Sequence, residues 1–259
     1  MISNNSLARF AARLNRHSLL SNEELQALLK MCCLPAQFQA RRDIVPTNKT
    51  VDHACLIVEG LAGRFDLMRD GRRQVTALHL PGDMCDLHSV VQPHTAWSIT
   101  AMTATSVLFV PHEDLQRLAI RYPGLAMAFW RDTAADAAVL AKWIGNLGRK
   151  DARARVAHLF CETAFRMELI GLGTRRSFDL PLTQEQLADA TGLTAVHVNR
   201  TLQGLRETRT LSFQSSRAEI LDWDRLVEIA DFDSDYLMLQ ASRNPSFETS
   251  ARAELPVGA

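Results

Sequence analysis

A short stretch between positions 196 and 203 combines the kinds of side chain that read DNA bases. It contains an aliphatic group, an imidazole, a cation and two amides: Val196, His197, Asn199, Arg200 and Gln203. At 100° per residue of an α-helix, these residues fall on or beside one face. In the major groove, arginine pairs with guanine, amides pair with adenine, and an aliphatic group contacts the thymine methyl. The face therefore predicts a recognition helix.

Two helices and a tight turn are needed to position this face. Thr183 and Gln186 form a capping-box pattern, in which each side chain satisfies a free backbone N–H, so we expect a helix to begin at Thr183. Gly192 suits the left-handed conformation that ends such a helix. Thr194 then caps a second helix, whose apolar positions 198, 202 and 205 face a core. The alternative is an ordinary helical corner whose polar side chains only meet water.

Residues 182–206 resemble the winged helix-turn-helix of CRP/FNR-type bacterial transcription regulators, above all in TQEQLADATGLT followed by VNRTLQGLR. The resemblance implies that Arg200 contacts a base and that Thr194 holds a phosphate. It also implies that the homodimer binds a palindromic operator and works with RNA polymerase. The chain has Ala195 and Val196 where the best-known members carry charged residues, so the family does not fix its operator sequence. The expected DNA contacts are Thr183, Gln184, Thr194, Ala195, Val196, His197, Asn199, Arg200, Gln203 and Arg217.

Arg217 belongs to a predicted wing after the recognition helix. Short strands are expected at 211–213 and 219–221, with residues 215–217 as the tip, where Arg217 can meet a phosphate. The charge distribution agrees with DNA binding at this end of the chain. Lys/Arg and Asp/Glu are equal at 29 each, yet residues 149–209 hold 10 Lys/Arg against 7 Asp/Glu, and residues 210–259 hold 4 against 9. A local basic face on a neutral chain can bind DNA, and a dimer presents it twice.

A long helix over residues 124–147 carries a heptad pattern. Its apolar and small residues are spaced 4, 3, 4, 3, 4 and 3: Ala126, Trp130, Thr133, Ala137, Leu140, Ile144 and Leu147. A 3.5-residue period favours a second helix of the same kind as the partner, so these residues predict a homodimer interface. Packing of this helix on its own chain is the alternative. In the family that the chain resembles, this helix forms the dimer interface.

The N-terminal half has strand composition. Clear strands are expected at 54–58, 61–68, 74–80, 98–102 and 106–110, with an Asp70-Gly71 hairpin turn. Their spacing suits a jelly roll, and IVEGLAGRF and LHLPGD resemble the cyclic-nucleotide-binding-like β-roll of CRP/FNR-type proteins. The chain is predicted to be α+β, with an N-terminal double-stranded β-helix (jelly roll), a long dimerisation helix and a C-terminal winged helix-turn-helix. The expected parts are a sensory domain at 1–122, the helix at 123–148, the DNA-binding domain at 149–241 and a disordered tail at 242–259.

The effector of this β-roll is the open part of the interpretation. In relatives that bind cyclic AMP, an acid holds the ribose and an arginine holds the phosphate. Here the matching stretch is GDMCDLHSVVQPHTAWS, where Asp83 can stand in for the acid but Ala96-Trp97-Ser98 offers no cation. We therefore expect no tight binding of cyclic AMP. The effector-pocket candidates are Asp83, Cys85, Asp86, His88 and Trp97.

His88 also suggests a second kind of sensor. GDMxxxHS resembles the haem-containing carbon-monoxide sensors of the family, in which the histidine matching His88 ligates iron. Cys85 and His79 lie close to it in the sequence, and Cys85 with His88 could share a metal. A loop histidine held by hydrogen bonds is the simpler interpretation. We expect no resident cofactor or metal.

The remaining patterns exclude several classes of protein. The five cysteines show no disulfide framework, and no apolar run approaches the ~20 residues needed to span a bilayer, so we expect a cytoplasmic protein. The first residues form an amphipathic helix through Leu7, Phe10, Ala11 and Leu14 rather than a transit peptide. A glycine-rich phosphate loop, HExxH and a nucleophile elbow are all missing from the sequence, so we predict no enzyme. The rival function is a β-roll signalling module without specific DNA binding.

Overall fold

Two short helices precede the β-rich half of the chain. The computed structural model describes residues 2–238, and α1 spans Ile2–His17 while α2 spans Asn22–Leu29. The predicted amphipathic helix is confirmed as α1, whose apolar residues Leu7, Phe10 and Leu14 are buried. Ser21 and Glu24 form a complete capping box at the start of α2. Both helices therefore pack on the core through buried apolar side chains.

Two antiparallel sheets form the predicted β-roll. One has the strand order β1-β7-β3 and the other β2-β6-β4-β5. The strands are β1 Leu34–Phe38, β2 Asp43–Val45, β3 His53–Glu59, β4 Ala62–Leu67, β5 Arg73–His79, β6 Ser98–Ala101 and β7 Thr105–Pro111, with the short 3-10 helix η1 at Leu87–Val90. The five predicted strands are present within one or two residues at each end. β1 and β2 were not predicted.

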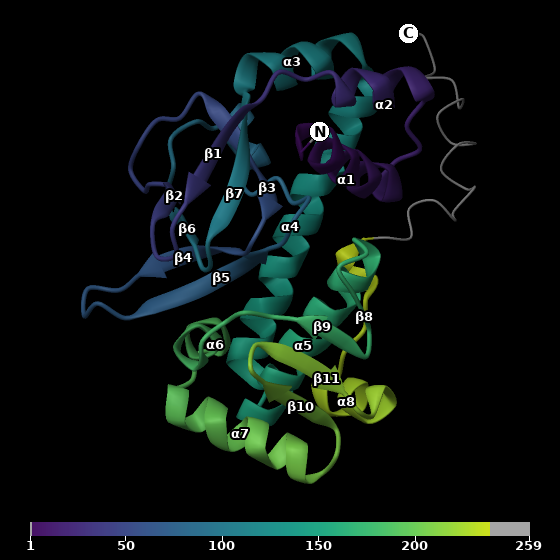
Figure 1. Ribbon diagram of the computed structural model, residues 1–259. Helices are drawn as coiled ribbons and strands as arrows, with labels where there is room; N and C mark the ends of the chain where they lie inside the picture. The colour runs from purple at the N-terminus through teal and green to yellow at the C-terminus, as the bar shows by residue number, and fades with distance from the viewer. Residues whose placement is uncertain (1, 239–259) are drawn as a thin grey trace, which may run out of the picture.

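The next two helices lead out of the roll. α3 spans His112–Arg121, and α4 runs from Pro123 to Arg149, slightly longer than the predicted 124–147. Pro123 occupies the first turn of α4, where a missing N–H costs nothing. Figure 1 shows α4 passing from the upper, β-rich part of the molecule into the lower part. A single helix thus connects the two halves.

The lower half contains the helix-turn-helix and a small sheet. Its elements are α5 Ala152–Leu169, β8 Gly173–Thr174, β9 Ser177–Asp179, α6 Gln184–Thr191, α7 Ala195–Glu207, β10 Leu211–Gln214, β11 Arg217–Ile220, α8 Trp223–Ala230 and the 3-10 helix η2 Asp235–Leu237. The sheet order is β10-β11-β9-β8. The expected winged helix-turn-helix is therefore confirmed, with two more strands than predicted. α7 lies at the far end of the molecule from the roll (Figure 1).

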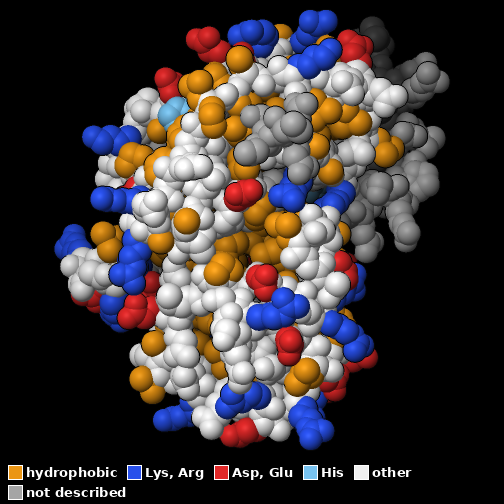
Figure 2. All heavy atoms as spheres, in the orientation of Figure 1, with side chains coloured by type: hydrophobic (Ala, Val, Ile, Leu, Met, Phe, Trp, Pro, Cys, Tyr) orange, Lys and Arg blue, Asp and Glu red, His pale blue; other side chains and the backbone are white. Residues whose placement is uncertain are grey.

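Three apolar cores hold these elements together. One lies between the two sheets and includes Ile57 and Ile99, and a second lies between the β3-β7 face and the helices α1–α4. The third joins the roll to the lower half, because Phe65 and Val75 of the β4-β5 hairpin share it with Leu187 of α6. Hydrophobic side chains also gather in the hollow between the upper and lower parts in Figure 2. The reading head, defined as residues 152–230, is thus packed directly on the sensory roll.

Polar contacts reinforce this packing. The Gln186 Nε2 atom donates to the Met102 carbonyl at 2.8 Å, and the Gln74 Nε2 atom donates to the Asp189 carbonyl at 2.8 Å. Among residues 2–238, no helix is long and apolar enough to cross a membrane. The predicted tail at 242–259 lies outside the described residues.

Candidate DNA-binding interface and sensory cavity

The turn before α7 is built as the sequence predicts. Thr183 accepts a hydrogen bond from the Gln186 N–H, and the Gln186 side chain accepts from the Thr183 N–H at 2.8 Å. Gly192 ends α6 with φ of +64°, in the left-handed region. This conformation favours glycine, and a Cβ atom there would lie 2.9 Å from Leu147 Cδ2, which would have to shift. The turn is thereby fixed against the end of α4.

The outward face of α7 presents the predicted base-reading side chains to solvent. Thr194 caps the helix by accepting from the His197 N–H, while Val198 and Leu205 are fully buried beneath it. Val196 is 71% exposed, a high value for an aliphatic side chain. Of the predicted DNA contacts, Thr183, Gln184, Thr194, Val196, His197, Asn199, Arg200, Gln203 and Arg217 are exposed, and Ala195 is half-buried. Lys and Arg side chains also lie along the lower edge of the molecule, where α7 is placed (Figure 2).

The wing differs in detail from its prediction. Ser215 and Ser216 form the tip with positive φ angles, but Arg217 is the first residue of β11 and not part of the tip. Its guanidinium contacts Asp179 Oδ1 at 3.1 Å and donates to Ser177 Oγ at 2.8 Å. The cause is β9, which pairs with β11 and was not predicted. Its Nε atom also lies 3.9 Å from Glu219 Oε1, and the side chain is about half exposed.

The heptad residues of α4 are only partly covered by their own chain. Trp130 is 71% exposed and Ile144 is 62% exposed. Ala137 is also exposed, and Ala126, Thr133, Leu140 and Leu147 are half-buried. The opposite side, with Phe129 and Trp143, is buried against the roll and the head. The three exposed residues are open to a second helix, and the homodimer interface stays a prediction.

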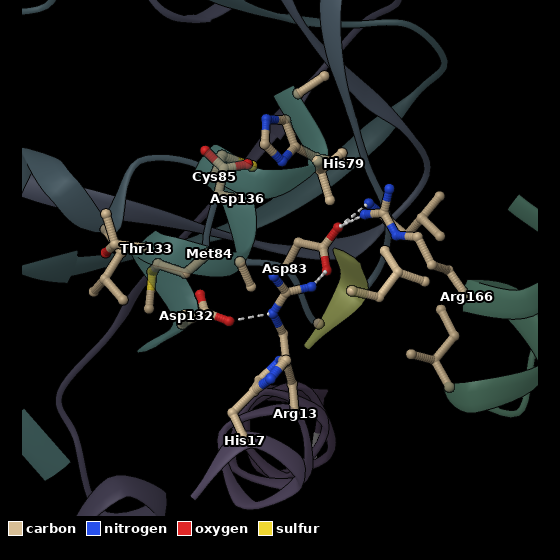
Figure 3. Close-up of a pocket in the computed structure, with 18 of the residues that line it drawn as sticks. Arg13, His17, His79, Asp83, Met84, Cys85, Asp132, Thr133, Asp136 and Arg166 are labelled. Atoms are coloured by element: carbon tan, nitrogen blue, oxygen red, sulfur yellow. Dashed lines mark hydrogen bonds and ion pairs between the residues drawn. The ribbon is translucent and has the colours of Figure 1, made fainter. Parts of the chain in front are cut away.

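A cavity lies where the roll, α1, α4 and α5 meet. Three of the predicted effector-pocket residues, Asp83, Cys85 and His88, line it. Asp83 is buried, and both of its carboxylate oxygens are already bonded: Oδ1 to Arg13 at 2.6 Å, and Oδ2 to Arg166 at 2.6 Å and to the Leu80 N–H at 2.8 Å. Figure 3 shows the two arginines approaching Asp83 from opposite sides. Asp83, the residue that could stand in for the ribose-binding acid, is therefore held by the protein itself.

The ion pairs continue into the neighbouring helices. Arg13 also contacts Asp132 of α4 at 2.5 Å, and Arg166 contacts Glu162 of α5 at 3.2 Å. Burial alone would raise the pKa of Asp83, but Arg13 and Arg166 hold that pKa below its ordinary value. The carboxylate is therefore charged at neutral pH.

Glu162 connects these ion pairs to Tyr236, near the end of the described residues. It accepts hydrogen bonds from Trp143 Nε1 at 2.9 Å and from the Tyr236 hydroxyl at 2.8 Å. We call Arg13, Asp83, Asp132, Glu162 and Arg166 the charge network. Because its members come from α1, the roll, α4 and α5, the network connects the sensory roll with the reading head.

Two other effector-pocket candidates lie elsewhere. Asp86 does not line the cavity, because its Oδ1 atom accepts from the Cys55 N–H at 2.7 Å inside the roll. Burial raises the pKa of Asp86 to about 7. Trp97 does not line the cavity either, but its ring lies 5.2 Å from that of His88 and carries the Arg64 guanidinium on its face at 5.1 Å. Burial, with Arg64 nearby, lowers the pKa of His88, so this imidazole is neutral.

Among residues 2–238, no group of three or more His, Cys, Asp or Glu side chains is placed to hold a metal ion. Cys85 and His88 do not form such a group. Burial raises the pKa of the Cys85 thiol well above its ordinary value. A protonated, buried thiol is an inert core group.

The arginines of the cavity are not among the predicted effector-pocket residues, because a cation was considered only near Ala96-Trp97-Ser98. They come from residues 13 and 166, far from that stretch. The spacing of Arg9, Arg13 and Arg16 at i, i+4 and i+7 was the available signal, since it places all three on one side of α1, and all three line the cavity. Arg16 donates to the Leu169 carbonyl of α5.

Comparison with known proteins agrees with this arrangement. Residues 35–122 match the family described as cyclic nucleotide-binding domain, and residues 154–229 match the Crp-like helix-turn-helix domain. The chain is 29% identical to the transcriptional activator protein FnrL of Cereibacter sphaeroides over 218 residues, covering 83% of this chain and 87% of that protein. It is 30% identical to the nitrogen fixation regulation protein FixK of Azorhizobium caulinodans, covering 72% and 75%. The structure of FixK2 from Bradyrhizobium japonicum superimposes with a TM-score of 0.70 at 27% identity, covering 77% of this chain and 98% of FixK2.

Proposed function

The chain belongs to the CRP/FNR family of DNA-binding transcription regulators, and from this membership we propose that it acts as a homodimer on a two-fold symmetric site. Each protomer inserts α7 into the major groove of one half-site. The observation that carries the proposal is the outward face of α7, where Val196, Asn199 and Arg200 are exposed above a buried apolar stripe. In this dimer the two half-sites lie about 34 Å apart, one turn of the double helix.

The dimer forms through the exposed heptad side of α4. Trp130 and Ile144 are large apolar groups whose exposure to water is unfavourable in a monomer, and a second α4 packed against the first covers both. Dimerisation also places two recognition helices on one duplex, which doubles the contacts with phosphate and base edges. The oligomeric state is thus the first property to test.

Replacing Trp130 or Ile144 by glutamate inserts a charge into the proposed interface. Light scattering is expected to give a dimer for the wild type and a monomer for Trp130→Glu and Ile144→Glu at micromolar concentration. Ile120→Glu is the matched control, because Ile120 is 83% exposed on α3, outside the heptad pattern. A wild-type monomer that leaves footprints on single half-sites contradicts the proposal.

Arg200 reads a base in this proposal. Arg200→Ala is expected to cost about 1–3 kcal/mol of binding free energy on the selected site and much less on random DNA, because only a base contact depends on sequence. Titration of both duplexes at one salt concentration measures the difference. Equal losses on both DNAs contradict the assignment of the reading face.

We propose that a signal acts on DNA binding through the β-roll and that this signal is not cyclic AMP. Asp83, the acid available for a ribose, is bonded to Arg13 and Arg166. Cyclic AMP is therefore expected to leave the DNA affinity unchanged within a factor of about two, which corresponds to less than 0.5 kcal/mol of coupling. A calorimetric titration that gives a micromolar dissociation constant contradicts this expectation.

We also propose that His88 does not hold haem. A haem ligand needs an apolar pocket beside it for the macrocycle, whereas the His88 ring packs on Trp97, which itself carries a guanidinium. The residues around His88 do not fit the group. Protein from haem-replete cells is expected to be colourless, and a Soret band that His88→Ala removes contradicts this proposal.

The remaining partners follow from the family. Its members named above are transcription regulators, and we propose that this chain works in the cytoplasm and contacts RNA polymerase at its promoters. A transcription assay with purified polymerase and a selected site tests the contact. The rival function, a β-roll signalling module without specific DNA binding, is supported only if selection on random duplexes yields no preferred sequence.

A further inference from the structure

Gln184 and Asn199 belong to different helices of the reading head, and their side chains meet at its surface. Gln184 is the first residue of α6, and Asn199 lies in the second turn of α7. The Asn199 Nδ2 atom donates a hydrogen bond to Gln184 Oε1 at 3.2 Å, and both residues are exposed. They share a shallow surface groove, whose lining residues are Gln184, Ala195, Val196, Asn199, Arg200 and Gln203.

The hydrogen bond determines what Asn199 can offer to DNA. A carboxamide has two N–H donors on its nitrogen and one acceptor oxygen. In this pair, one N–H of Asn199 is used by Gln184 Oε1. The second N–H and the Oδ1 atom stay available, and the orientation of the amide is set because its nitrogen faces Gln184. Asn199 therefore presents one donor and one acceptor side by side.

One donor beside one acceptor is the complement of adenine in the major groove. Adenine exposes the acceptor N7 next to the donor N6, so an amide pairs with both at once, whereas guanine exposes two acceptors that suit arginine. Asn199 and Arg200 line the same groove, and base pairs are stacked about 3.4 Å apart. The side chains of Asn199 and Arg200 can thus reach neighbouring base pairs.

We propose that Gln184 is a positioning residue for base readout, which holds the Asn199 amide so that it reads adenine next to the guanine read by Arg200. The inference rests on the proposed function and adds the sequence preference to it. The composition of the groove supports this choice of bases. A carboxylate is the group that accepts from cytosine N4, and the six residues that line the groove include none.

The positioning of Asn199 by Gln184 is expected to change the DNA affinity by a measurable factor. An asparagine free to rotate must be ordered when DNA binds, and ordering a side chain of this kind reduces affinity by a factor of about 3 to 10. Gln184 has already ordered Asn199 in the free protein. Loss of the base contact itself has the larger effect, about 10-fold or more in discrimination against the wrong base. Loss of Gln184 is therefore expected to weaken the adenine preference less than loss of Asn199.

The test is a selection of binding sites from randomised two-fold symmetric duplexes, followed by sequencing, with the full-length protein. Five proteins are compared: wild type, Asn199→Ala, Gln184→Ala, Gln184→Glu and Gln203→Ala. Gln184→Glu keeps an oxygen that accepts from Asn199 Nδ2, so it is the conservative variant. Gln203→Ala removes an exposed amide from the same groove, and no hydrogen bond joins Gln203 to Asn199 in the described structure, so it is the matched control. Thermal melting checks that each variant is folded.

The wild type is expected to select adenine next to guanine in each half-site. Asn199→Ala abolishes the adenine preference, Gln184→Ala weakens it about 3- to 10-fold with the guanine preference unchanged, and Gln184→Glu and Gln203→Ala retain it. An undiminished adenine preference in folded Gln184→Ala overturns the positioning role while the proposed function stands, and so does its loss in Gln184→Glu. A wild type that selects no symmetric site overturns the proposed function itself.

Discussion

The substitution Arg166→Ala tests whether the charge network holds the reading head on the roll. Arg166 comes from α5 and bonds Asp83 at 2.6 Å and Glu162 at 3.2 Å, and its side chain is only 14% exposed. Alanine removes the cation and leaves two buried carboxylates each with one partner fewer. Because a buried charge is poorly solvated, its free energy rises when an opposite charge is lost. The variant is expected to be less stable, although its DNA-binding face is untouched.

The magnitude follows from the bonds that remain. Removal of one partner of a buried ion pair commonly costs about 3–5 kcal/mol. Asp83 keeps Arg13 and the Leu80 N–H, and Glu162 keeps Trp143 and Tyr236. Since neither carboxylate is left without partners, the lower end of that range applies. We expect the free energy of unfolding to fall by about 3 kcal/mol.

Equilibrium urea unfolding at neutral pH, followed by tryptophan fluorescence, measures this change. Arg117→Ala is the control, because the Arg117 side chain, which pairs with Asp114, is 72% exposed and is expected to contribute about 0.5 kcal/mol or less. The double substitution Arg166→Ala with Asp83→Asn is expected to cost less than the sum of the single changes, since the uncompensated charge on Asp83 is gone. An Arg166→Ala protein as stable as the Arg117→Ala control, or a strictly additive double variant, refutes the reasoning.

Three further changes test individual features. Burial raises the pKa of Asp86 to about 7. The stability contributed by its protonated form is therefore complete below the ordinary pKa near 3.8 and is lost as the pH rises through about 7. Asp86→Asn should flatten the fall in unfolding free energy between pH 5 and pH 8, as measured by urea unfolding at both pH values. Gly192→Ala should cost about 1–2 kcal/mol, seen as a melting temperature lowered by several degrees, because φ is +64° and the new Cβ meets Leu147. Arg217→Ala should weaken binding to specific and random DNA alike and lower the salt slope by about one, because a phosphate contact carries no sequence information; a loss confined to the specific site contradicts it.

Local signals in the sequence were sufficient for the helix starts and for the turn before α7. The Thr183-Gln186 capping box forms as predicted, because the residues that define it are three positions apart and need no distant partner. The same holds for Gly192 and for the Thr194 cap of α7. Of the heptad residues of α4, Trp130, Ala137 and Ile144 are exposed, and their role in a dimer stays a prediction.

Long-range contacts could not be predicted in this way. Arg13 meets Asp132 across 119 positions and Asp83 across 70, and no local pattern says which arginine pairs with which acid. The short strands β8 and β9 are stabilised by β11, so their two or three residues carry no strand pattern of their own. The same pairing explains why Arg217 was placed at the wing tip.

The core shared by the roll and the reading head sets the minimum free energy that a signal must supply to rotate the head. Phe65 and Val75 of the β4-β5 hairpin are buried together with Leu187 of α6. Burial of each such side chain is worth about 1.5–3 kcal/mol, so a rotation of the head that uncovered all three would require on the order of 5–9 kcal/mol. A ligand can supply that free energy only through its difference in affinity for the two arrangements, a ratio of at least a few thousand. A ligand with similar affinities for the two arrangements would therefore not rotate the reading head.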